Sequence, residues 1–207
     1  GRRPSDCGDR GLAPERRVTD FLEDRKVFFL YCLALFRPGW TPPDLPTDRT
    51  VAGDVSNWPE DDVAVLIEEG RRHLDRLLLD IDQTRTRAQQ AVTATLALLV
   101  VVAAQLPGVA KSQMQLTMLA VSGFLLAVGF CGALSITVIQ VRVSVIHAGV
   151  LSTSATPIRR RLAKDYAEAV IETGRTVHTM LTVLSEAARY VTLGGALDGI
   201  LWLVRHI

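Results

Sequence analysis

The sequence predicts an all-α integral membrane protein, built from a membrane-spanning helical hairpin, long cytoplasmic amphipathic helices and a third hydrophobic helix at the C-terminus. Charge is segregated along the chain, since residues 88–140 carry Lys111 as their only charged side chain. Residues 116–139 are uncharged and extend roughly 36 Å as a helix, enough to cross a hydrocarbon core of about 30 Å. Apolar residues on both sides of this region recur at spacings of three and four, which is typical of helices that bury one face.

The first 58 residues are expected to lie outside the membrane. Residues 1–17 are polar and rich in Gly and Arg, which predicts disorder, and residues 18–37 are predicted to form one helix. The apolar run 27–36 superficially resembles a signal-peptide core, but it starts late and no small-residue cleavage site follows it. It is also too short to span a bilayer, which takes about 20 residues, so a helix buried against the protein or lying at the membrane surface is preferred. Prolines then make residues 38–48 a linker or an irregular loop.

A long amphipathic helix is predicted from residue 59, with residues 59–90 as its cytoplasmic part. Ser56 or Asn57 provides the helix cap, and the acidic residues from Glu60 onward complement the positive end of the helix dipole. One apolar or small-residue stripe follows this helix: Val63, Ile67, Gly70, Leu74, Leu77, Ile81, Thr84 and Ala88. Because no breaker precedes Pro107, we expect this helix to continue without interruption into the first membrane span.

The membrane hairpin is assigned to residues 91–139, because the short connection after Pro107 forces its two spans to be antiparallel. Lys111 is the only charge in that connection. Basic residues lie on the far sides of both spans: Arg85, Arg87, Arg142, Arg159, Arg160, Arg161 and Lys164. By the positive-inside bias, both flanks and the N-terminus are therefore expected in the cytoplasm.

Residues 140–189 are predicted to be a second cytoplasmic region. It contains a break at residues 149–157, and an amphipathic helix follows that break. Its stripe matches the earlier one: Leu162, Tyr166, Ala169, Thr173, Val177, Met180, Leu184, Ala188 and Val191. The two helices are thus placed to pack on each other or on neighbouring copies of the chain. Residues 190–207 follow as an apolar segment, either a short third span or an amphipathic surface helix.

Small residues one turn apart mark the second span and let another backbone approach closely. They fit an oligomer or pore interface, although packing against the first span is the preferred interpretation. The residues assigned to helix packing and a homo-oligomer interface are Gly123, Ala127, Gly129, Ala133, Leu74, Leu77 and Ile81.

Asp198 is the most informative polar residue, since a carboxylate at mid-membrane costs roughly 2.5 to 3.5 kcal/mol by insertion scales. With Arg205 it is assigned to a polar path facing a water-filled lumen or a subunit contact, and the alternative is a surface helix with Asp198 in water. The basic run Arg159, Arg160 and Arg161 is assigned to lipid headgroups or an anionic ligand, although a role in topology alone explains it as well.

Several function classes find no support in the composition. A formal net charge of +1 gives no reason to expect a nucleic-acid partner. Cys7, Cys32 and Cys131 are too few and scattered for a disulfide framework or a zinc site and are interpreted as free thiols, compatible with a reducing compartment. The four histidines lie far apart and no phosphate-binding glycine loop is present, so the chain is interpreted as no enzyme, with no catalytic residues, metal or cofactor.

Three segments carry a family resemblance: LDRLLLDIDQTRTRAQQAVTATLALLVVV, LTMLAVSGFLLAVGFCGALSITVI and ARYVTLGGALDGILWLV. This order of cytoplasmic helix, hairpin and closing apolar segment resembles the small membrane effectors of nucleotide-signalled anti-phage systems, the SLATT and Pycsar-type transmembrane families. The resemblance implies a homo-oligomer in the bacterial inner membrane, which permeabilises it on a nucleotide signal as part of antiviral defence. The competing interpretation is a non-pore, membrane-anchored scaffold or accessory subunit that binds a protein partner through its cytoplasmic helices. A transporter or redox subunit is not supported, because repeated spans and paired intramembrane histidines are lacking.

Overall fold

A computed structural model describes residues 14–37, 39–40, 42–45, 58–109, 112–139 and 158–206. The regular structure of these residues is entirely helical, which confirms the all-α prediction. The helices are α1 (Pro14–Ala34), α2 (Glu60–Val109), α3 (Gln113–Val138) and α5 (Ile158–His206). Outside the described residues lie the predicted break at 149–157, the caps Ser56 and Asn57, and Cys7, Lys111 and Arg142.

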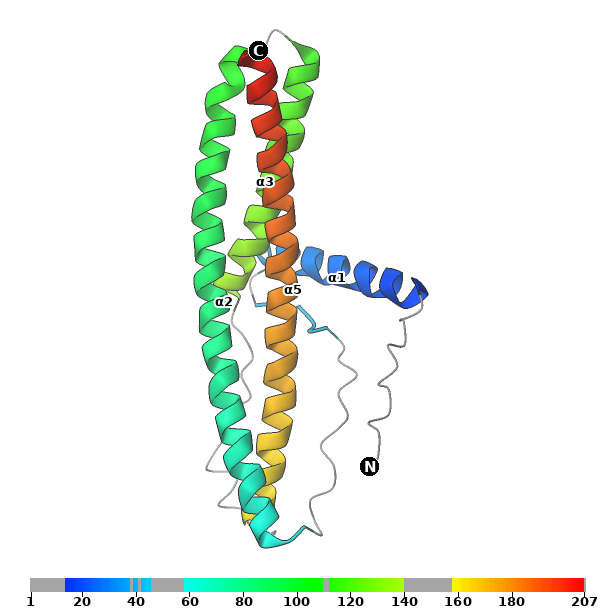
Figure 1. Ribbon diagram of the computed structural model, residues 1–207, viewed down its shortest axis with the longest axis vertical. Helices are drawn as coiled ribbons and strands as arrows, with labels where there is room; N and C mark the ends of the chain where they lie inside the picture. The colour runs from blue at the N-terminus through cyan, green and yellow to red at the C-terminus, as the bar shows by residue number, and fades with distance from the viewer. Residues whose placement is uncertain are drawn as a thin grey trace, which may run out of the picture.

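Two long helices, α2 and α5, run side by side in the same direction and define the long axis of the molecule (Figure 1). At 1.5 Å per residue each is roughly 75 Å long. The shorter α3 runs antiparallel to both and packs against their C-terminal halves, so the C-terminus lies at the same end as the connection between α2 and α3 (Figure 1). The prediction that the two amphipathic helices are placed to pack on each other is confirmed, since Leu77 and Ile81 share a buried cluster with Val177 and Met180.

Helices α2 and α5 continue without a break through residues 90 and 189, where the boundaries between cytoplasmic and hydrophobic segments were predicted. The predicted continuity of α2 past residue 90 is confirmed, but α2 ends at Val109 and not before Pro107. A proline in the last turn removes only one backbone hydrogen bond, and the next residues can remain helical. Likewise α5 passes residue 189 without a break, so the closing apolar segment is the second half of one helix.

The first helix differs from its prediction at both ends. It begins at Pro14 and not at residue 18, because proline is tolerated in the first turn, where its missing N–H would have no helical partner. It ends at Ala34, before residue 37, and the chain leaves through a tight turn in which the Phe36 and Arg37 amides donate to the Leu33 and Ala34 carbonyls.

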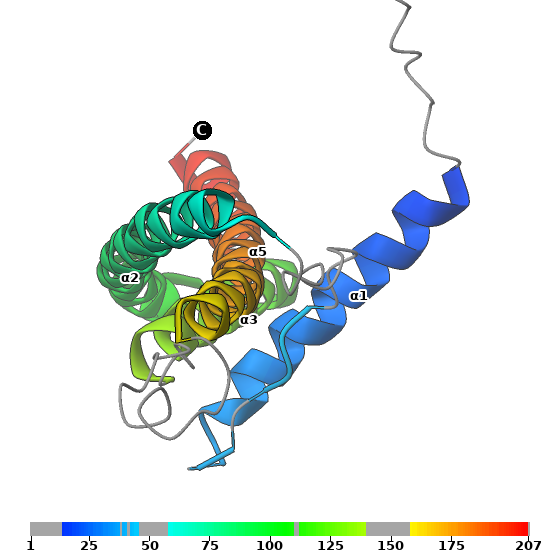
Figure 2. The ribbon, with the colours of Figure 1, turned by 90° about the horizontal axis from the view of Figure 1, so that it is seen from below.

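Helix α1 runs across the long axis of the bundle and lies along one side of it (Figures 1 and 2). Phe28, which is fully buried, fixes this crossing by stacking on Tyr190 of α5 with ring centroids 5.3 Å apart. The segment after α1 is held to α5 as well. The Leu45 amide donates to Thr179 Oγ1 (3.0 Å), and Thr176 Oγ1 donates to Asp44 Oδ2 (3.0 Å).

Candidate functional site

A buried polar pair lies between the C-terminal halves of α2 and α5. Gln105 on α2 donates its side-chain amide to both carboxylate oxygens of Asp198 on α5, at 3.0 and 3.2 Å. Asp198 is only 6% exposed. The carboxylate is therefore satisfied inside the chain, which is a third arrangement beside the lumen and the water-facing surface considered from the sequence.

Asp198 is buried, whereas Thr192 and Trp202 on the same helix are exposed. Arg205 lies in the last turn of α5, and its side chain is outside the described part of the structure. Of the two residues assigned to the polar path, the structure thus shows the partner of Asp198, which is Gln105 of α2.

The C-terminal parts of α2 (88–109) and α5 (190–206) are their apolar halves, and the threonine hydroxyls of the first of these are satisfied locally. Thr93 and Thr95 donate to the Gln89 and Ala91 carbonyls one turn earlier, at 3.0 and 2.6 Å, as helical threonines commonly do. Ser122 instead bonds across the bundle, donating to the Gly194 carbonyl at 2.8 Å. This last contact joins α3 directly to the second half of α5.

The small residues assigned to helix packing have different neighbours. A Cβ atom on Gly123 would lie 3.6 Å from Val102 on α2, whereas one on Gly129 would lie 2.7 Å from Val191 on α5. Ala133 is fully buried, and Ala127 is exposed. Gly123 therefore packs on the first apolar segment, Gly129 packs on α5, and Ala127 lies on the outer surface.

The stripe residues of α2 face inward. Leu77 and Ile81 are buried in the core shared with α5, and Leu74 is half-buried. Packing within the chain accounts for the burial of Leu77 and Ile81.

The basic run forms the foot of α5, at the opposite end from the apolar halves. Arg159 lies 3.9 Å from Glu60, Arg161 lies 3.8 Å from Asp165, and Arg160 donates to the Trp58 carbonyl at 3.5 Å. Arg161 and Arg189 are separated along α5 by about 42 Å, at 1.5 Å per residue. The basic run and the apolar C-terminal half of α5 therefore lie far apart along the helix.

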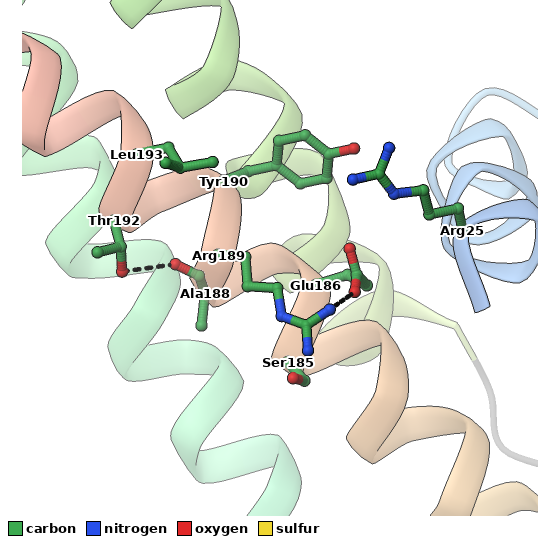
Figure 3. A pocket seen from close by; sticks show the side chains of 8 residues that line it. All are labelled: Arg25, Ser185, Glu186, Ala188, Arg189, Tyr190, Thr192 and Leu193. Atoms are coloured by element: carbon green, nitrogen blue, oxygen red, sulfur yellow. Dashed lines mark hydrogen bonds and ion pairs between the residues drawn. The ribbon is translucent and has the colours of Figure 1, made fainter. Parts of the chain in front are cut away.

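A cavity of about 550 Å³ opens where α1 meets α5 (Figure 3). Arg25 of α1 points toward Tyr190 and Glu186 of α5, and Glu186 is buried and ion-paired with Arg189 (Figure 3). Two guanidinium groups and one carboxylate line this cavity, and the carboxylate is paired with one of the two guanidinium groups.

Sequence reasoning missed Gly132 and Gly194 as points of close helix approach, whereas Gly70 belongs to the predicted stripe of α2. A Cβ atom on Gly132 would meet the ring of Phe28, one on Gly194 would lie 2.8 Å from Leu126, and one on Gly70 would lie 3.0 Å from Tyr166. Gly132 stands one turn from Gly129, which was a usable signal. Gly194 belongs to the closing apolar segment, whose partner helix is not evident from the sequence, while the contact of Gly70 with Tyr166 joins the two predicted stripes.

Cys32 and Cys131 are free thiols in the structure. Burial, with a smaller effect of the neighbouring Cys131, raises the pKa of Cys32 to about 12, so this thiol is protonated at neutral pH and poorly nucleophilic. Among the described residues, no group of three or more His, Cys, Asp or Glu side chains is placed to hold a metal ion.

Two of the helices, α2 and α3, are long and apolar enough to cross a membrane. No known protein family, curated protein or solved structure matches the chain.

Proposed function

We propose that this chain is a multi-pass protein of the bacterial inner membrane, and that it acts as an oligomeric effector which permeabilises that membrane when a signal arrives. Of the 18 residues that form the most apolar stretch of each helix, only 11% in α2 and 44% in α3 are buried within the chain. In the core helix of a soluble protein, most residues of such an apolar stretch would be buried. Exposure of so much apolar surface supports lipid as its surroundings.

The second half of α5 is proposed to enter the membrane with α2 and α3. Its inner face packs on α3 through Gly194 and the Ser122 bond, and on α2 through Gly195, where a Cβ atom would lie 3.7 Å from Leu98; a helix lying on the membrane surface would not make these contacts. Large apolar side chains are exposed on all three helices: Leu96, Val100, Val101, Leu106, Met114, Phe124, Leu193, Ile200, Leu203 and Val204. Apolar side chains outside and a hydrogen-bonded polar pair inside are the arrangement expected of a bundle in lipid.

The observation that carries the proposed activity is the Gln105 and Asp198 pair. Asp198 is the only acidic side chain in the described apolar halves, and its hydrogen bond depends on α2 and α5 staying together. A change in their packing removes this partner, and the carboxylate then requires water. When several copies present Asp198 to a shared interface, the result is a hydrated path across the membrane.

The trigger is proposed to act on the charged halves of α2 (residues 60–87) and α5 (residues 158–189), which extend away from the apolar halves. A nucleotide signal is one candidate, and its phosphates would suit the exposed arginines at the foot of α5. A protein partner is the other.

The test is the membrane potential of cells that express the protein, with and without the candidate signal. We expect Gln105→Leu to depolarise cells without a signal, because it leaves Asp198 unpaired, and Asp198→Leu to abolish depolarisation while membrane insertion persists. Ile200→Leu, on the exposed side of α5 near Asp198, is the matched control and should behave as wild type. If wild type never depolarises cells under any trigger, the permeabilising function is wrong.

The second candidate is a membrane-anchored scaffold. It is favoured by two exposed apolar side chains on the charged half of α2, Val65 and Leu79, which are 62% and 61% exposed. They lie two heptads apart on one face, outside the region assigned to lipid, and suit a protein contact. A scaffold should leave the membrane potential unchanged in every variant described above.

A further inference from the structure

Helix α1 has two apolar faces, and the bundle covers only one of them. Val27, Phe28, Tyr31 and Ala34 are buried. The other face is an exposed stripe of Leu22, Phe29 and Leu33, continued by Phe36 in the following turn, with exposures of 60%, 49%, 56% and 75%. Spacings of seven and four residues align Leu22, Phe29 and Leu33 on one side of the helix.

The contacts of α1 with α5 show which way this stripe faces. Asp24 lines a cavity with His178 and Leu181, toward the charged half of α5, whereas Arg25 lines the cavity with Leu193, toward the apolar half. At about 100° per residue, Leu22, Phe29 and Leu33 fall on the same side of α1 as Arg25. The exposed stripe therefore faces the end of the molecule that carries the apolar halves.

Tyr31 provides an independent check on this orientation. It falls on the Asp24 side of α1, and its phenol interacts with Asp44, which accepts a hydrogen bond from Thr176 in the charged half of α5. The polar contacts of α1 thus point toward one half of the bundle and its uncovered apolar side chains toward the other.

The position of α1 along the bundle matches one edge of the apolar region. Gly132, beneath Phe28, is about 29 Å along α3 from its first residue, Gln113, close to the thickness of a hydrocarbon core of about 30 Å. Arg87 on α2 and Arg189 on α5 are the last charged residues before the apolar halves begin. Helix α1 thus crosses the bundle where the charged halves give way to the apolar ones.

We infer that α1 is an interfacial helix, which lies in the plane of the membrane with Leu22, Phe29, Leu33 and Phe36 in the acyl region of the cytoplasmic leaflet. The inference rests on the membrane insertion proposed above. Helix α1 runs across the long axis of the bundle (Figures 1 and 2), which keeps side chains on one face of the helix at a similar level along that axis. The stripe continues the exposed apolar surface of the spanning helices, and Arg25 and Lys26 bring positive charge to the headgroup level.

The test places a spin label at one position at a time in the full chain, in a background with Cys7→Ser, Cys32→Ala and Cys131→Ala. The chain is reconstituted in vesicles of phosphatidylcholine and phosphatidylglycerol, and collisions with oxygen, which concentrates in lipid, are compared with collisions with a water-soluble nickel chelate. Leu33→Cys reports the stripe. Glu23→Cys, exposed and about 80° around the same helix from Leu33, is the matched control, and Phe124→Cys reports insertion of α3.

We expect oxygen collisions to dominate at positions 33 and 124, and nickel collisions to dominate at position 23. If position 124 is in lipid while position 33 meets the nickel chelate, the interfacial helix is ruled out and membrane insertion stands. A label at position 33 that is shielded from both reagents means that protein, such as a second copy, covers the stripe, and this also overturns the inference. If position 124 meets the nickel chelate, the insertion itself is wrong and the inference fails with it.

Discussion

The ring of Phe28 on α1 lies over Gly132 on α3, so that a Cβ atom at position 132 would come within 2.8 Å of the ring Cζ atom. The same Cβ atom would lie 3.2 Å from the Cβ atom of Ala187 on α5. Residue 132 is therefore the point where three helices approach one another, and only glycine leaves room for the ring.

Replacing this glycine should loosen the docking of α1. We expect Gly132→Ala to lower the free energy of unfolding by about 1–3 kcal/mol, a typical cost of overpacking, because Phe28 is enclosed and has little room to move. The measurement is unfolding of the purified protein by a denaturing detergent. Gly123→Ala is the control, since its added methyl meets only Val102 at 3.6 Å, and equal losses in the two variants would contradict the assignment.

The polar pair should behave as a coupled unit in a double-mutant cycle. Gln105→Leu removes one partner and leaves a buried carboxylate unsatisfied, which costs about 1–3 kcal/mol or more. The double variant Gln105→Leu with Asp198→Leu should recover most of this loss, because two apolar groups in contact leave no polar atom unpaired. Detergent unfolding of the four proteins gives the coupling energy, and additive losses would show that the two side chains do not interact.

Assembly should depend on exposed rather than buried apolar residues of the charged half. We expect a homo-oligomer in nanodiscs that Val65→Glu with Leu79→Glu converts to a folded monomer, because these side chains are exposed in the single chain. Leu77→Glu, which places a charge in the buried core, should unfold the charged half instead. Native mass measurement combined with circular dichroism separates the two effects. A wild-type monomer at high protein load would argue against assembly.

Stability should fall at high pH because of Tyr31. Burial, followed by the charge of Asp44 and a hydrogen bond with it, raises the pKa of this phenol above its ordinary value of 10.0. The folded protein therefore binds the phenol proton more tightly than the unfolded chain, so its contribution is present below about pH 10 and is lost as the pH rises above that value. Tyr31→Phe should reduce this loss when the free energy of unfolding is followed through that range. Parallel curves for the two proteins would assign the effect elsewhere.

The topology predicted from the basic residues can be tested in whole cells. A membrane-impermeant maleimide should modify Ser112→Cys, in the connection between α2 and α3, and spare Arg72→Cys, in the charged half of α2. Both variants are made without the native cysteines. Lysed cells provide the control for reactivity, and modification of position 72 in intact cells with sparing of position 112 would reverse the orientation.

The helices were predictable because each depends on local patterns. The stripe from Val63 to Ala88 and the uncharged run ending near Ile139 indicated α2 and α3 well. Helical periodicity and long apolar runs depend only on residues that are close together in the sequence. The start of α1 was misplaced because residues 1–17 are polar and rich in Gly and Arg, and the end of α2 was misplaced because Pro107 predicts a break. Proline is a reliable breaker only inside a helix, and near either end its cost is small.

The sequence by itself determined the helical class, the separation of charged from apolar halves and the two segments able to cross a membrane, because these depend on residue type and spacing alone. Only the tertiary structure decided which groups meet. Asp198 was recognisable as costly, yet its partner Gln105 lies 93 residues away along the chain, and no local pattern relates them. The same holds for Phe28 over Gly132 and for the side of α1 left uncovered, since these depend on how the helices rotate and cross when they pack.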